Sequence, residues 1–136
     1  MPSAGYSGTP LIKKLGLKDD QKILLLNPPV DYFEFLEKDI SGQVCPKGGL
    51  PDWVHLFAAN NRDFEKGMHS LKKVIEKNPQ ITIWVSWYKK SAGIPTDLTE
   101  DTIRNFALQN DLVDVKVCAV SDKWSGLKLV VPLKKR

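Results

Sequence analysis

Three nearly continuous apolar runs dominate the hydrophobic pattern of this chain. They cover residues 22–27 (KILLLN), 53–59 (WVHLFAA) and 81–87 (ITIWVSW). Runs of this length, rich in β-branched and aromatic residues, are typical of strands that are buried on both faces. Strands of this kind form parallel sheets with helices on both sides, so the pattern predicts an α/β core.

The segments around these runs carry helical periodicity and helix boundary signals. Asn60-Asn61 precedes a stretch with apolar residues at positions 64, 68, 71 and 75, and Thr99 is a natural N-cap before Glu100 and Asp101. Shorter helices are expected over residues 30–38 and, as a leading helix, over residues 9–16. Small and polar residues, with two glycines, make residues 1–8 an expected flexible arm.

The period of the pattern changes near the end of the chain. Apolar and polar residues alternate in 113–119 and again in 127–131, on either side of the polar turn 121–123. Alternation across a short turn predicts an antiparallel hairpin. Residues 43–45 can form at most a short strand. The whole pattern predicts a Rossmann-like, mostly parallel sheet, flanked by helices and closed by a C-terminal antiparallel hairpin, with its core in residues 22–133.

Composition fits one globular domain over residues 1–136. The chain is 42% apolar and 26% charged, which is ordinary for a domain of this size. Its net charge of +4 comes from lysines and arginines spread along the sequence, which favours a solvated basic surface over a nucleic-acid patch. The sequence has no apolar run near the length of a membrane span and no signal-peptide pattern, and its two cysteines lie far apart. We therefore expect a cytoplasmic protein in a reducing compartment.

The order of expected elements resembles the Rossmann-like fold of S-adenosylmethionine-dependent methyltransferases over residues 22–133. The resemblance implies the strand order two, one, three, four, six, five, with residues 43–45 as the second strand. In that family a glycine-rich loop follows the first strand and an acidic residue ends the second. Here Asn27-Pro28-Pro29 and Cys45-Pro46 occupy these places. Two prolines remove two N–H donors from the phosphate loop, so we expect no cofactor of this kind and no methyl transfer.

A second resemblance covers nearly the whole chain. It is similar to a family of short bacterial proteins of unknown function, and the resemblance lies in the strings YSGTPL, WVSWYKK, TDLTED, VDVKVCAV and WSGLKLV, which begin at residues 6, 84, 96, 113 and 124. This resemblance implies a bacterial protein. It carries no activity, ligand or catalytic residue with it.

The best candidate site lies where parallel strands end, because open α/β sheets bind ligands at their carboxyl edge. There the aromatic and cationic residues of the segment after the third run could hold an acidic ligand. The alternative is that Trp87 packs a loop while the lysines are solvated. The candidate rim consists of Asn27, Asn60, Ser86, Trp87, Lys89, Lys90, Ser91 and Trp124.

Neither histidine has a nucleophile or metal ligand at a recognisable spacing. His55 lies within an apolar run and is expected to be a hydrogen-bonded core residue, and His69 lies on a polar helix face. We assign no catalytic, cofactor-binding or metal-binding residue. The leading hypothesis is a non-catalytic methyltransferase-like domain that binds a small acidic ligand or a protein partner. Two alternatives stay open: a small enzyme that acts on an anionic substrate through residues 87–97, and a weak nucleic-acid binder.

Overall fold

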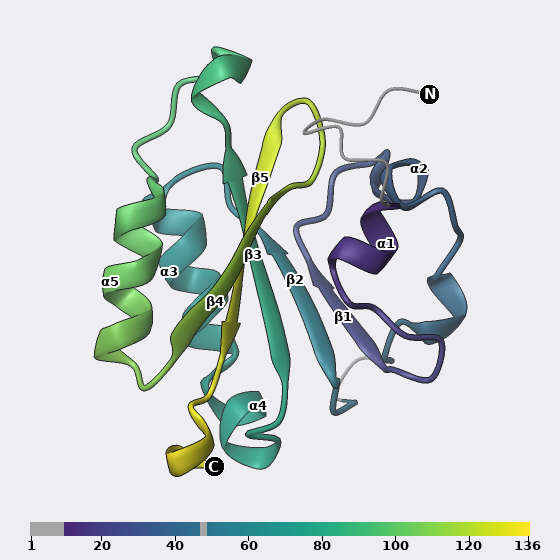
Figure 1. The fold of residues 1–136 in the computed structure, drawn as a ribbon, viewed down its shortest axis with the longest axis vertical. Helices are drawn as coiled ribbons and strands as arrows, with labels where there is room; N and C mark the ends of the chain where they lie inside the picture. Colours follow the sequence, from purple (N-terminus) through teal and green to yellow (C-terminus); the bar gives the residue numbers. More distant parts are fainter. Residues whose placement is uncertain (1–9, 47–48) are drawn as a thin grey trace.

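A five-stranded mixed sheet lies between two layers of helices (Figure 1). The computed structural model describes residues 10–46 and 49–136, so the expected arm over residues 1–8 and the first residue of the expected leading helix, Thr9, lie outside the described residues. The strands are β1 (Ile23–Leu26), β2 (Trp53–Phe57), β3 (Thr82–Tyr88), β4 (Val113–Ala119) and β5 (Trp124–Val130). Their order across the sheet is β1-β2-β3-β5-β4. The α/β, Rossmann-like prediction is confirmed.

Strand direction divides the sheet into two parts. β1, β2 and β3 are parallel, whereas β5 pairs antiparallel with both β3 and β4. Val44 forms a single parallel bridge with Ile23, and the amide of Cys45 donates to the Ile23 carbonyl over 2.7 Å. The pairing order therefore agrees with the expected one, but residues 43–45 contribute one bridge instead of a strand.

One helical layer contains α3 (Asn61–Ser70), α4 (Lys72–Lys77) and α5 (Glu100–Gln109), and the other contains α1 (Leu11–Lys14) and α2 (Tyr32–Leu36) (Figure 1). Each layer packs on its own buried cluster of side chains. The two helices in the second layer are shorter than expected. After α1 the backbone turns at Gly16, which has a left-handed conformation with φ +66°. Helix α2 ends in the same way at Glu37, which has φ 58°.

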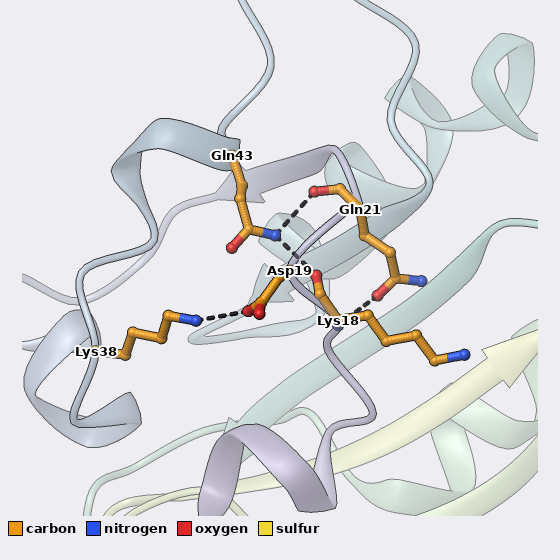
Figure 2. A network of polar contacts seen from close by, with 5 residues as sticks. All are labelled: Lys18, Asp19, Gln21, Lys38 and Gln43. Atoms are coloured by element: carbon orange, nitrogen blue, oxygen red, sulfur yellow. Dashed lines mark hydrogen bonds and ion pairs between the residues drawn. The ribbon is translucent and has the colours of Figure 1, made fainter.

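A polar network fastens the segment before β1 to the segment after α2 (Figure 2). The side-chain amide of Gln43 donates to the carbonyls of Lys18 and Gln21 over 2.8 and 2.9 Å. Lys38 pairs with Asp19 at 2.6 Å, and the amide of Lys18 donates to the side chain of Gln21. These bonds hold the turn that leads into the first strand.

Candidate functional site

The structure separates the two aromatic residues of the predicted rim. Trp87 is 7% exposed and packs in the layer of α3 and α5, whereas Trp124 is 8% exposed and packs in the layer of α1 and α2. The register explains this separation, because Tyr88 and not Trp87 lies opposite Trp124. Opposite residues share a face and neighbouring residues do not. Trp87 and Trp124 therefore do not form a common aromatic wall.

Ser86 is not a rim residue, because its side chain is fully buried. Its hydroxyl lies 2.7 Å from Nε2 of His55, and the hydroxyl of Tyr32 lies 2.9 Å from Nδ1 of the same ring. The His55 ring is also fully buried and stacks on Phe57, with ring centroids 4.2 Å apart. The prediction that His55 is a hydrogen-bonded core residue is confirmed.

Tyr32, His55 and Ser86 form a series of hydrogen bonds like that of a catalytic serine, its histidine base and a third residue that orients the histidine. All three side chains, however, lie in the buried core. Burial lowers the pKa of His55 to about 3 and raises the pKa of Tyr32. The ring is therefore neutral at physiological pH, with one nitrogen donating and the other accepting. The Ser86 hydroxyl is fully buried and therefore not accessible to a substrate in this conformation. The hydrogen bonds among Tyr32, His55 and Ser86 stabilise the fold.

The remaining rim residues do lie at the carboxyl edge of the sheet, in three separate loops. Asn27 follows β1, is exposed and has φ 56°. The side chain of Asn60 accepts from the amide of Asp63 over 2.8 Å, as an N-cap of α3. Lys89 precedes the 3₁₀ turn Lys90–Ala92, in which Lys90 and Ser91 are exposed.

A groove of about 510 Å³ lies at the opposite, amino edge of β3. Its walls are α4, the end of α5 and the segment after β5, near the C-terminus at the bottom of Figure 1. The volume is in the range of small-molecule sites, roughly 300–1,000 Å³. Five of its lining residues are apolar and come from three helices and two loops: Met68, Ile75, Phe106, Leu112 and Val131.

Three positive and two negative side chains also line this groove: Lys72, Lys135, Arg136, Glu76 and Asp111. Lys135 pairs with Asp111, their Nζ and Oδ1 atoms lying 2.5 Å apart. Nε of Arg136 donates to the carbonyl of Val131 over 2.8 Å, which fixes the guanidinium at the groove wall. An apolar surface beside surplus positive charge suits a ligand with an apolar body and an anionic group.

Sequence reasoning missed this groove because its residues come from three distant segments, 68–79, 106–112 and 131–136. The one feature of the sequence that could have indicated the groove is the basic run at residues 134–136, but such a run is equally typical of a solvated surface. Asp111 has a left-handed backbone with φ 60°, and this turn brings its carboxylate towards the segment after β5. Such a turn at an aspartate has no strong sequence signature.

Neither cysteine has the features of a reactive thiol. Burial raises the pKa of both Cys45 and Cys118, although the nearby Lys116 partly offsets this effect at Cys118. Within residues 10–46 and 49–136, no group of three or more His, Cys, Asp or Glu side chains could hold a metal ion. In the same ranges, no helix has the length and apolar character needed to span a bilayer.

Comparison with solved structures supports the fold. The chain is similar to a protein of the NADB-Rossmann superfamily from Streptococcus agalactiae, with a TM-score of 0.54 and 10% sequence identity. The match covers 94% of this chain and 70% of that one. No protein-family model and no curated protein matches the chain. At this identity the likeness shows a Rossmann-like fold alone, and the resemblance to a bacterial family stays a prediction.

Proposed function

We propose that this protein is a non-catalytic, methyltransferase-like domain that binds a small amphipathic anion in the groove between α4, α5 and the segment after β5. The observation that carries the proposal is the combination of groove volume, apolar lining and surplus positive charge. The sheet order, with the Ile23–Val44 bridge on one side and the antiparallel β5–β4 pair on the other, supports the methyltransferase-like part.

The loop after β1 supports the absence of a nucleotide cofactor. Pro28 and Pro29 lack N–H groups at the place where a Rossmann-type loop donates to phosphate. Hydrogen bonds to a charged group contribute about 1.5–3 kcal/mol each, so losing two weakens binding by roughly 10²–10⁴-fold. Affinity for S-adenosylmethionine is therefore expected to be negligible.

The groove suggests a linear carboxylate as a probe. Each methylene group that enters an apolar surface contributes about 0.8 kcal/mol, so two more methylenes strengthen binding by roughly tenfold. The anionic end is expected to pair with Arg136 or Lys72, since Lys135 is already paired with Asp111. A neutral alcohol of the same length lacks this contact and is expected to bind more weakly.

Isothermal titration with hexanoate, octanoate and decanoate tests the proposal. We expect affinity to rise with chain length, and Arg136→Gln to weaken decanoate binding by about tenfold. Lys90→Gln is the matched control, because Lys90 is exposed at the other edge of the sheet. No heat of binding at millimolar ligand, or equal weakening by both substitutions, would refute the groove as the site. Binding of S-adenosylmethionine at micromolar concentration would refute the non-catalytic assignment.

A further inference from the structure

The groove holds acidic as well as basic side chains, and their pairing is incomplete. Lys135 and Asp111 neutralise each other, with their Nζ and Oδ1 atoms 2.5 Å apart. Glu76 also lines the groove and is exposed. Among residues 10–46 and 49–136, no basic nitrogen lies within 4.0 Å of the Glu76 carboxylate, and no donor forms a hydrogen bond with it. The groove therefore presents a negative group as well as its surplus positive charge.

The position of Glu76 on α4 does not stabilise that helix. Because α4 covers Lys72–Lys77, Lys72 lies at its amino end and Glu76 lies in its last turn. Acidic residues stabilise the amino end of a helix and basic residues its carboxyl end, which is the reverse of this order. A lysine four residues before a glutamate is also the less favourable arrangement for an ion pair within a helix. Helix stability therefore does not explain why a glutamate lies at this place in the groove.

Positive groups line the same groove as Glu76. Lys72 lies four residues before Glu76, which is about 6 Å along the axis of α4, and both side chains line the groove. Arg136 lines the groove from the segment after β5, with its Nε bonded to the carbonyl of Val131. In the part of the chain that the structure describes, no carboxylate forms an ion pair with Lys72 or Arg136. A small ligand in the groove can therefore meet groups of both charges beside the apolar lining.

These charges favour a ligand that carries an ammonium group beside its carboxylate. A plain carboxylate brings a second negative charge into a groove that already contains Glu76, and like charges repel each other. An ammonium group on the ligand offsets this repulsion and supplies three N–H donors to the glutamate. A neutral substituent such as a hydroxyl does not offset the repulsion. The groove is therefore more complementary to a zwitterion than to a simple anion.

We propose that the ligand of the groove is an apolar α-amino acid. Its carboxylate pairs with Arg136 or Lys72, its ammonium group pairs with Glu76, and its side chain lies on the apolar lining. The Lys135–Asp111 ion pair stays intact beside the ligand. This inference rests on the proposed function, because it names the class of carboxylate that the same groove binds.

Isothermal titration at neutral pH with octanoate, 2-hydroxyoctanoate and L-2-aminooctanoate tests the inference. The last two ligands have nearly the same size and differ in the charge of one substituent. An exposed ion pair strengthens binding by up to about fivefold, so L-2-aminooctanoate is expected to bind roughly fivefold more tightly than the other two. Glu76→Gln is expected to abolish this preference. It is also expected to strengthen octanoate binding by about twofold, because the repulsion is lost.

Glu34→Gln is the matched control, because it changes the net charge equally and Glu34 is exposed on α2, in the other helical layer. It is expected to keep the preference for L-2-aminooctanoate. Equal affinity for the three ligands, tighter binding of octanoate, or a preference that survives Glu76→Gln would overturn this inference and leave the groove as the binding site. No heat of binding with any of the three ligands would overturn it together with the proposed function.

Discussion

The buried ring of His55 makes the stability of the fold depend on pH. Its folded-state pKa of about 3 is well below the value of about 6.5 for an unfolded histidine. The unfolded chain therefore binds one more proton than the folded chain between these two values, and acid favours unfolding. The stabilising effect is fully present above pH 6.5 and is lost as the pH falls towards 3.

The magnitude follows from a difference of one proton. The slope is at most about 1.4 kcal/mol per pH unit, so lowering the pH from 6.5 to 4.5 is expected to decrease the free energy of unfolding by about 2–3 kcal/mol. Asp19 and Asp39, whose pKa values are lowered by hydrogen bonds from Lys38 and Ser41, add their own losses below about pH 4. Measurements between pH 4.5 and 7 therefore isolate the histidine.

Urea unfolding, followed by the fluorescence of the four tryptophans, measures this slope. His55→Gln is expected to be less stable at pH 7 and to lose most of the slope. His69→Gln is the matched control, because His69 is exposed on α3, and it is expected to keep the wild-type slope. If His55→Gln kept the full slope, the ring would not be buried in its neutral form and the reasoning would fail.

Three further substitutions test contacts within the fold by urea unfolding. Gly67→Ala is expected to lower the free energy of unfolding by about 1–3 kcal/mol, since its Cβ would lie 2.6 Å from a methyl carbon of buried Leu56; a net gain from helix propensity would disprove this close packing. Asn60→Ala removes the cap of α3 and is expected to cost about 1 kcal/mol, whereas Asn60→Asp is expected to be neutral; an unchanged alanine variant would argue against a capping role. Trp84→Phe removes the N–H that donates to the Leu15 carbonyl over 2.9 Å and is expected to cost about 1–3 kcal/mol; wild-type stability would show that this bond does not hold α1.

The strands of the parallel part could be predicted because each one is an apolar run that must be buried on both faces. Residues 43–45 illustrate the limit of that reasoning. Their pairing with β1 consists of one bridge, between Val44 and Ile23, and Pro46 follows directly, a residue typical of the edge of a sheet. The local sequence predicted that this segment forms at most a short strand, but not that it forms only one bridge.

The candidate rim could not be predicted because it depends on strand register. A shift of one residue between β3 and β5 would have placed Trp87 opposite Trp124, and no local signal fixes that register.

Backbone amide NMR with decanoate tests the central claim most directly, because it shows where a ligand binds. We expect saturable shifts in residues 68–79, 106–112 and 131–136, and none in the loops after β1, β2 and β3. Shifts confined to residues 27–30, 58–61 and 88–91 would place the site at the carboxyl edge of the sheet and contradict the assignment of the groove.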